Sequence, residues 1–255
     1  MGSLSERVAL VTGASRGIGA ATARVLSEAG ARVIITHRDS AAGAEAVLVS
    51  LTGDGHRSAQ VSATDSDGLR AAAATVAEIE GRLDILVNNA GTSRVVPHGD
   101  LDALDDELFD KIFQTNVRSA FATVRAFRSL LAAGEGGLVA NISSLAAKMA
   151  NGSNIAYCAS KAAIDNMSMS LARALAPEIR VVSVAPGLVD TEFTRGWAPE
   201  VRSRMIDETP LGRLATPEDV ARTVLAVAVD LPMTTGVVIP VDGGRPLGAA
   251  KKVHT

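Results

Sequence analysis

The sequence predicts an α/β fold, a doubly wound parallel sheet of about seven strands with helices on both faces. Short β-branched apolar runs alternate with Ala-rich segments of helical length, as in repeated strand-helix-strand units. The 255 residues, 47% of them hydrophobic, suffice for one sizeable core. No Pro/Gly/Ser-rich linker or internal repeat divides the chain, so we expect residues 1–255 to form a single domain.

Most of the predicted strands are runs of apolar residues, because strands buried on both faces lack polar alternation. These runs are 7–12, 31–36, 57–62, 83–88, 137–143, 179–185 and 236–241. Six segments with apolar residues at helical spacing are predicted helices: 16–29, 40–51, 67–80, 102–132, 154–176 and 217–230. Gly30 and Gly53 follow two of them, where a helix C-terminus favours positive φ. The segment 187–216, rich in Pro, Gly and charge, is predicted to be a lid over a site.

Composition argues against several classes of partner. A net charge of -3 and a pI near 5.8 give no reason to expect binding to nucleic acid or to an anionic membrane. The lone Cys158 cannot form an internal disulfide, and no Cys/His spacing is typical of zinc, so we expect no metal and a reducing, cytoplasmic compartment. The apolar run Val8 to Val11 is too short for a signal peptide or a membrane anchor.

A glycine-rich stretch, TGASRGIG over residues 12–19, lies where the first strand ends and the first helix begins. Backbone N–H groups at a helix N-terminus bind phosphate, and glycines allow close approach. We therefore predict that this stretch binds the pyrophosphate of a nucleotide, through Gly13, Ser15, Arg16, Gly17, Ile18 and Gly19. A tight strand-helix turn without a ligand is the alternative reading.

Further motifs follow in order along the chain. They are Asn88-Asn89-Ala90-Gly91 after the fourth strand, Asn116 in the next helix, Ser144 after the fifth strand, Tyr157 and Lys161 in YCASK, Pro186-Gly187 with Thr191, and Val241-Asp242-Gly243-Gly244. Ser144 precedes Tyr157 by thirteen residues, which selects it over Ser143. Together with the TGxxxGxG spacing, this set resembles the short-chain dehydrogenase/reductase family over about residues 7–247.

The resemblance implies a Rossmann-type fold and hydride transfer between a nicotinamide and a carbonyl or alcohol carbon. It implies a catalytic set of Asn116, Ser144, Tyr157 and Lys161. It also implies cofactor contacts from Asn89, Ala90, Gly91, Tyr157, Lys161, Pro186, Gly187, Val189 and Thr191. By the same resemblance, Lys161 bonds the nicotinamide ribose and Asn116 binds a water that relays protons to Lys161.

The YxxxK pair also has a physical interpretation. Positions four apart on a helix share a face, so the Lys161 ammonium can lie near the Tyr157 phenol. A positive neighbour, together with an oxidised nicotinamide, is expected to lower the tyrosine pKa from about 10, which suits a general acid/base. Ser144 can donate to the substrate oxygen as charge develops there. The ordinary alternative for Tyr157 is a ring that merely packs near a helix start.

The end of the second strand predicts which nicotinamide is used. His37 stands where NAD enzymes of this type place a carboxylate, and Arg38 follows. A carboxylate would repel a 2′-phosphate, whereas Arg38 and Arg16 could bind it, so we expect NADP(H). Asp39 keeps NAD(H) open as the alternative, because a shift of one residue would place it at the ribose. Ser62 replaces the family's usual adenine-contacting Asp.

The substrate is expected to be a small or medium-sized carbonyl or alcohol compound. Its walls are predicted from residues 145–155 and from Leu188, Phe193, Trp197 and Met205, although Trp197 and Met205 could equally pack between subunits. Gly212-Arg213-Leu214 resembles 3-oxoacyl thioester reductases, and Arg125 and Arg173 are candidates for contacting an acidic acyl carrier protein. The loop 132–137 lacks the basic cluster expected for that partner, so sugars, polyols, steroids and xenobiotic carbonyls stay open.

The resemblance also implies a homodimer through the segments 102–132 and 154–176, or a homotetramer that adds the last strand. Two other functions compete with a reductase. One is a nucleotide-binding sensor of the same fold, because fold alone never establishes catalysis. The other is an epimerase or dehydratase, whose members tend to carry a longer C-terminal substrate domain.

Overall fold

The computed structural model describes residues 2–191, 194 and 198–249. In these residues seven strands form one sheet in the order β3-β2-β1-β4-β5-β6-β7. All neighbouring strands are parallel. The strands are β1 (Val8–Val11), β2 (Arg32–His37), β3 (Arg57–Gln60), β4 (Ile85–Asn88), β5 (Gly137–Ile142), β6 (Ile179–Pro186) and β7 (Val238–Val241). The α/β fold predicted from the sequence is confirmed.

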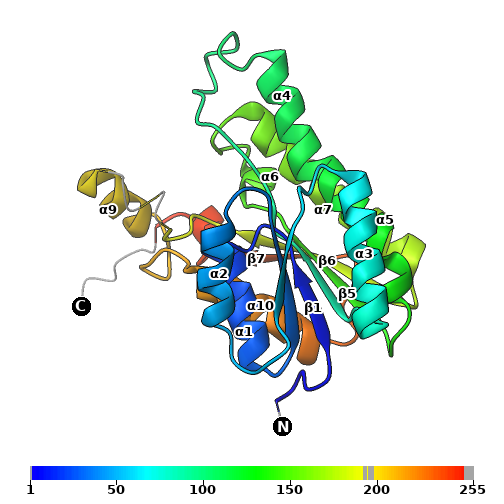
Figure 1. Ribbon diagram of the computed structural model, residues 1–255. Coiled ribbons are helices and arrows are strands. Elements are labelled where there is room, and N and C mark those ends of the chain that lie inside the picture. Colours follow the sequence, from blue (N-terminus) through cyan, green and yellow to red (C-terminus); the bar gives the residue numbers. More distant parts are fainter. Residues whose placement is uncertain (1, 192–193, 195–197, 250–255) are drawn as a thin grey trace, which may run out of the picture.

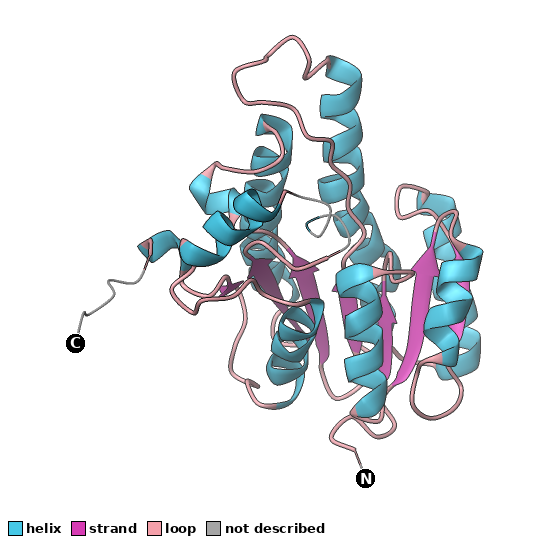
Figure 2. Ribbon diagram, turned by 90° about the vertical axis from the view of Figure 1, so that its left-hand side faces the viewer, coloured by secondary structure: helices cyan, strands magenta, loops and turns pink. Residues whose placement is uncertain are grey.

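Helices cover both faces of the sheet (Figures 1 and 2). One face packs against α1 (Gly17–Glu28), α2 (Ala41–Val49) and α10 (Pro217–Val229). The other packs against α3 (Ser66–Glu80), α5 (Ser119–Leu131) and α7 (Ile155–Leu175). The central strands β1, β4 and β5 are buried along their whole length, which explains their continuous apolar sequences.

Besides a π-helical stretch, four further elements complete the described chain. They are α4 (Asp106–Phe113), α6 (Ala146–Met149), α9 (Pro199–Asp207) and the 3₁₀ turn η2 (Arg245–Leu247). Figure 1 shows α4 at the opposite end of the molecule from the N-terminus. Among the helices of the described ranges, none combines the length and the apolar character that crossing a bilayer requires.

The predicted helix 102–132 is wrong in two respects. The helix begins at Asp106 and not at residue 102. Asp105 is its N-cap, because the Asp105 carboxylate accepts a 2.7 Å hydrogen bond from the Leu108 N–H. The helix is also interrupted by a π-helical stretch, η1 (Gln114–Arg118), between α4 and α5. A π stretch adds a residue to one turn and often marks a functional site.

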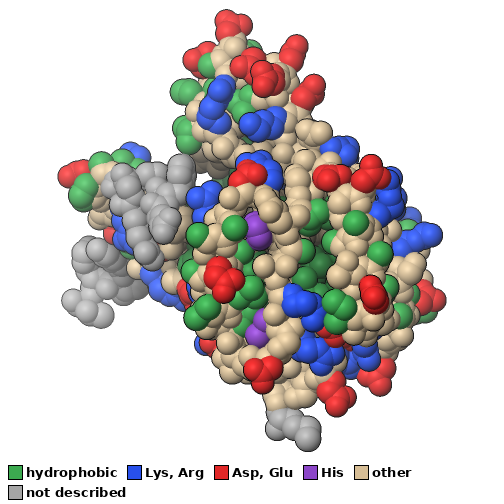
Figure 3. Space-filling view, in the orientation of Figure 1, with side chains coloured by type: hydrophobic (Ala, Val, Ile, Leu, Met, Phe, Trp, Pro, Cys, Tyr) green, Lys and Arg blue, Asp and Glu red, His purple; other side chains and the backbone are tan. Residues whose placement is uncertain are grey.

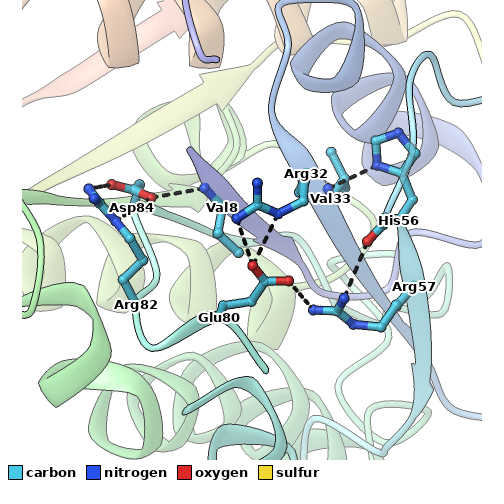
Figure 4. Close-up of polar contacts among 9 residues, drawn as sticks. Val8, Arg32, Val33, His56, Arg57, Glu80, Arg82 and Asp84 are labelled. Atoms are coloured by element: carbon cyan, nitrogen blue, oxygen red, sulfur yellow. Dashed lines mark hydrogen bonds and ion pairs between the residues drawn. The ribbon is translucent and has the colours of Figure 1, made fainter. Parts of the chain in front are cut away.

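Ion pairs join elements at the edge of the sheet where the strands begin (Figure 4). The buried Glu80 carboxylate, at the end of α3, receives Arg32 from β2 at 2.8 Å and Arg57 from β3. Asp84, just before β4, accepts a 2.8 Å hydrogen bond from the Val8 N–H of β1. These carboxylates therefore hold neighbouring strands in place far from the strand ends that carry the predicted site.

Basic and acidic side chains are interspersed over the face shown in Figure 3. This mixture agrees with a chain that carries 25 Lys and Arg against 28 Asp and Glu.

Candidate active site

A cavity of about 310 Å³ lies at the ends of β4, β5 and β6. Of the residues predicted from the sequence, it is lined by Ile18, Asn89, Gly91, Ser144, Tyr157, Lys161, Pro186, Gly187 and Val189. The structure therefore brings together motifs that are up to 171 residues apart, from Ile18 to Val189. It adds four lining residues that were not predicted to belong to the site: Thr92, Ser93, Ile142 and Ser143.

The glycine-rich turn runs from β1 into α1 beside this cavity. Gly13 and Gly17 have φ of 62° and 57°, a region that favours glycine. A Cβ at Gly17 would meet nothing within 4 Å, whereas one at Gly19 would lie 2.5 Å from Asn89 Nδ2. Arg16, which precedes α1, makes no side-chain cap to the helix. The turn is thus packed on its Asn89 side and open at Gly17, which fits a bound phosphate.

Thr12 joins the glycine-rich turn to the Asn89-Ala90-Gly91 turn. Its hydroxyl accepts 3.0 Å hydrogen bonds from the backbone N–H groups of Asn89 and Ala90. The Asn89 amide returns 3.0 Å bonds to the carbonyl oxygens of Thr12 and Gly13. These hydrogen bonds therefore hold the two turns together beside the cavity.

Tyr157 lies in the first turn of α7, and it lines the cavity together with Ser144, which follows β5. Asn154 caps the helix, because its Oδ1 accepts a 2.7 Å hydrogen bond from the Tyr157 N–H. Ser144 Oγ also accepts a 3.1 Å bond from the Ala146 N–H. The serine and tyrosine hydroxyls are thus presented together to the cavity.

The acidity of Tyr157 depends on its burial. Burial raises the pKa of the phenol above its ordinary value, and the Ser144 hydrogen bond only partly opposes this. In the protein chain by itself burial therefore dominates, and the lowering expected from Lys161 together with an oxidised nicotinamide stays a prediction. Helical spacing can be read from the sequence, whereas the desolvation of the phenol depends on tertiary packing.

Lys161 lies one turn after Tyr157 on the same helix. Its Nζ is 5.7 Å from the centre of the Tyr157 ring and donates a 2.7 Å hydrogen bond to the Ile142 carbonyl oxygen. Burial lowers the pKa of Lys161 to about 8, while the negative charge of Asp165, one turn further, raises it. The ammonium is therefore charged at neutral pH but close to titration.

Asn116 is buried in the π-helical stretch η1. Its Oδ1 accepts a 2.8 Å hydrogen bond from the Thr92 N–H, and its Nδ2 donates to the Thr92 carbonyl at 3.1 Å and to Ser160 Oγ at 3.0 Å. Ser160 adjoins Lys161, so the structure places Asn116 next to the Tyr157 helix as predicted. The local unwinding that turns it inward was not foreseen.

The end of β2 lies beside the glycine-rich turn, because the Ala14 N–H donates to the Thr36 carbonyl at 3.1 Å. His37 is buried, and its Nδ1 has no hydrogen-bond partner among the described residues. Arg38 is exposed and pairs with the carboxylate of Asp39. An orphaned imidazole nitrogen and a surface guanidinium thus lie where the adenosine end of a dinucleotide is expected.

The segment 187–216 contains α9, and its two ends lie together, since Val189 forms an isolated parallel bridge with Ala215. Arg202 of α9 forms a 2.8 Å ion pair with Asp190. The Thr191 N–H donates to Thr194 Oγ1 at 2.9 Å. Phe193 and Trp197 lie outside the described residues, and closure of this segment as a lid stays a prediction.

Comparison with known proteins adds independent evidence. The family model described as enoyl-(acyl carrier protein) reductase matches residues 13–245. The cis-4-hydroxycyclohexanecarboxylate dehydrogenase of Sinomonas cyclohexanicum is 40% identical over 245 residues, covering 94% of this chain and 96% of that protein. The 3-oxoacyl-(acyl-carrier-protein) reductase of Pseudomonas aeruginosa is 37% identical over 252 residues, with coverages of 95% and 98%.

A solved structure is similar over the same length. The short-chain dehydrogenase/reductase of the glucose/ribitol dehydrogenase type from Brucella melitensis superposes with a TM-score of 0.89 at 28% identity, covering 96% of this chain and 98% of that one. The matched residues include both glycine-bearing turns and the Tyr157 helix. The chain therefore belongs to the short-chain dehydrogenase/reductase family of oxidoreductases.

Proposed function

We propose that this chain is an NADP(H)-dependent oxidoreductase that interconverts a carbonyl and an alcohol, with Tyr157 as general acid/base. The observation that carries the proposal is that Ser144, Tyr157 and Lys161 meet in one cavity, with the buried Lys161 ammonium 5.7 Å from the centre of the tyrosine ring. All three residues line one cavity with Asn89 and Gly91. A nucleotide sensor would need the glycine-rich turn but has no evident need for this constellation.

Each of these residues has its own role in the reduction of the carbonyl. A bound nicotinamide supplies the hydride or accepts it. Ser144 donates a hydrogen bond to the substrate oxygen, which stabilises the negative charge that develops there. Tyr157 delivers the proton to that oxygen, and in the oxidation direction its phenolate removes it. Lys161, charged at neutral pH, favours the phenolate form of Tyr157 electrostatically.

The residues present fit a dinucleotide. The open turn at Gly17 and the first N–H groups of α1 would hold the pyrophosphate. Lys161 would bond the nicotinamide ribose, and Asn89, Ala90, Gly91, Pro186, Gly187, Val189 and Thr191 would surround the rest. Preference for NADP(H) rests on Arg38 and Arg16, two guanidinium groups able to bind a 2′-phosphate.

Two relatives share a reaction chemistry that supports one substrate class. The two curated relatives are named for a cyclic secondary alcohol and for a 3-oxoacyl thioester. Both names imply reaction at a secondary carbinol or ketone carbon, which is the chemistry proposed for Ser144 and Tyr157. We therefore propose a secondary alcohol or ketone as the substrate, and reduction as the direction in a cell that keeps NADP(H) reduced.

We also propose that the chain forms a homodimer through α5 and α7. Phe121 on α5 and Met169 on α7 are 44% and 47% exposed, so each helix presents a large apolar side chain that a second copy could cover. Sedimentation of the wild-type protein beside Phe121→Lys tests this, because a charge at a dimer interface should shift the protein to monomer.

The test of the function is turnover of NADPH with 4-oxocyclohexanecarboxylate and a 3-oxoacyl thioester by wild type and variants. Tyr157→Phe should lower kcat at least about 100-fold while NADPH still binds, because only the proton donor is lost. Ser144→Ala should lower it about 100-fold, and the matched control Ser143→Ala much less, because the Ser143 hydroxyl bonds the Lys161 carbonyl at 3.3 Å. Failure of the wild type to bind either nicotinamide would overturn the proposal.

A further inference from the structure

A short irregular segment, residues 92–97, follows Gly91. Its first two residues, Thr92 and Ser93, line the same cavity as Ser144 and Tyr157. We call residues 92–97 the wall segment. It lies outside the helices and strands, so hydrogen bonds to other segments must hold it in position.

The far end of the wall segment runs beside the residues that lead into α7. The Val96 N–H donates to the Ser153 carbonyl oxygen at 2.8 Å, and the hydroxyls of Ser93 and Ser153 hydrogen-bond to each other. The wall segment is thus attached directly to the start of the helix that carries Tyr157.

Asn154 lies at the centre of this attachment and is 1% exposed. Its Nδ2 donates to the Arg94 carbonyl oxygen at 2.7 Å and to Ser93 Oγ at 3.4 Å. Its Oδ1 accepts from the Tyr157 N–H at 2.7 Å. One buried amide therefore binds the wall segment with its nitrogen and the backbone of Tyr157 with its oxygen.

Asn116 makes the corresponding connection on the other side of Tyr157. Its amide holds both backbone groups of Thr92 and donates to Ser160 Oγ. The wall segment is therefore joined to α7 by two buried asparagines, one at position 154 and one through position 160. Tyr157 lies between these two points.

We propose that Asn154 is a positioning residue that sets the distance between the Tyr157 hydroxyl and the wall against which the substrate rests. This rests on the proposed function, because it assigns the wall segment to the substrate. The oxygen of Asn154 caps the helix, and its nitrogen holds the wall. These two tasks can be separated by substitution, since aspartate keeps the cap and cannot donate.

The experiment compares Asn154→Asp with wild type by backbone hydrogen exchange of residues 92–98 and by steady-state kinetics. In Asn154→Asp a carboxylate oxygen replaces the donor that lies 2.7 Å from the Arg94 carbonyl, so repulsion replaces the hydrogen bond. Exchange in 92–98 should rise about tenfold, because the wall opens locally. KM for the carbonyl substrate should rise about tenfold, with the dissociation constant of NADPH within about twofold of wild type.

Two variants control the experiment. Asn166→Asp makes the same change at an exposed position of α7 and should leave exchange and KM unchanged. Asn154→Ser keeps a capping oxygen without adding charge, and replaces Asn154→Asp as the test variant if the latter does not fold.

The proposal is overturned if the backbone hydrogens of residues 92–98 exchange at the wild-type rate in the Asn154 variants. Raised exchange with unchanged KM and kcat also overturns it, because the contact would then be structural only. Raised exchange in a protein whose wild type turns over no carbonyl compound supports the hold of Asn154 on the wall and rejects the proposed function.

Discussion

The Lys161 ammonium lies 5.7 Å from the centre of the Tyr157 ring and donates a 2.7 Å hydrogen bond to the Ile142 carbonyl oxygen. Ile142 ends β5, two residues before Ser144, so this bond joins the strand that carries the serine to the helix that carries the tyrosine. Lys161 thus contributes a positive charge to the site and also fixes the position of α7 relative to β5. Its charge is the part that pH can change.

The first prediction concerns that charge. Reduction should fall with an inflection near pH 8, where Lys161 loses its proton, and the rate at pH 9 should be about tenfold below its neutral value. Asp165→Asn should move the inflection to lower pH, because the Asp165 charge raises the Lys161 pKa. The pH profile of kcat/KM measures this, with Asp54→Asn on an exposed loop as the control. An unchanged inflection in Asp165→Asn would count against the coupling.

The second prediction concerns the choice of cofactor. Arg38→Asp should lower affinity for NADPH by at least about tenfold and leave NADH little changed, because it places a carboxylate near the 2′-phosphate. Asp39→Asn should raise NADPH affinity, because it releases Arg38 from its ion pair. Nicotinamide fluorescence titrations measure both. Tighter binding of NADH by the wild type would instead assign the ribose to Asp39.

The third prediction separates folding from binding in the glycine-rich turn. Gly19→Ala should cost about 1–3 kcal/mol of stability, because its Cβ would lie 2.5 Å from Asn89 Nδ2 and 2.8 Å from the Gly13 carbonyl oxygen. Gly17→Ala has open space, so it should cost only about 1 kcal/mol for its positive φ, yet weaken NADPH binding. Thermal unfolding and fluorescence titration test the pair. Equal NADPH affinities in Gly17→Ala and wild type would move the pyrophosphate away from this turn.

The fourth prediction concerns acid stability. Burial of Glu80 raises its pKa, but the hydrogen bonds from Arg57 and Arg32 outweigh burial and hold the pKa below its usual value. The stabilisation is therefore complete above the ordinary glutamate pKa and is lost as pH falls through the lower folded value. Glu80→Gln should lower the free energy of unfolding by about 2 kcal/mol at pH 7 and by much less in acid.

Urea unfolding at the two pH values measures this difference. Glu78→Gln, exposed on the same helix, is the matched control and should change stability by less than about 0.5 kcal/mol. If Glu80→Gln lowers the free energy of unfolding by the same amount at both pH values, the charge of the carboxylate is not the cause.

The sequence by itself determined the order of strands and helices and the position of each motif at a strand end. Periodicity and turn residues are local, and parallel strands bring their carboxyl ends to one edge, so Ser144 and Tyr157 could be expected together. The i, i+4 relation of Tyr157 and Lys161 is local in the same sense. Gly30 has the positive φ predicted for it, 101°.

Tertiary structure decided the rest, because it depends on contacts between distant segments. Asn116, in the π-helical stretch, hydrogen-bonds to Thr92 and Ser160. The spacing of residues in the sequence does not reveal these contacts. The raised pKa of Tyr157 comes from burial, a property of the elements packed around it. Asn154 looks in sequence like an ordinary helix cap, and its hold on Arg94, 60 residues away, exists only in the folded chain.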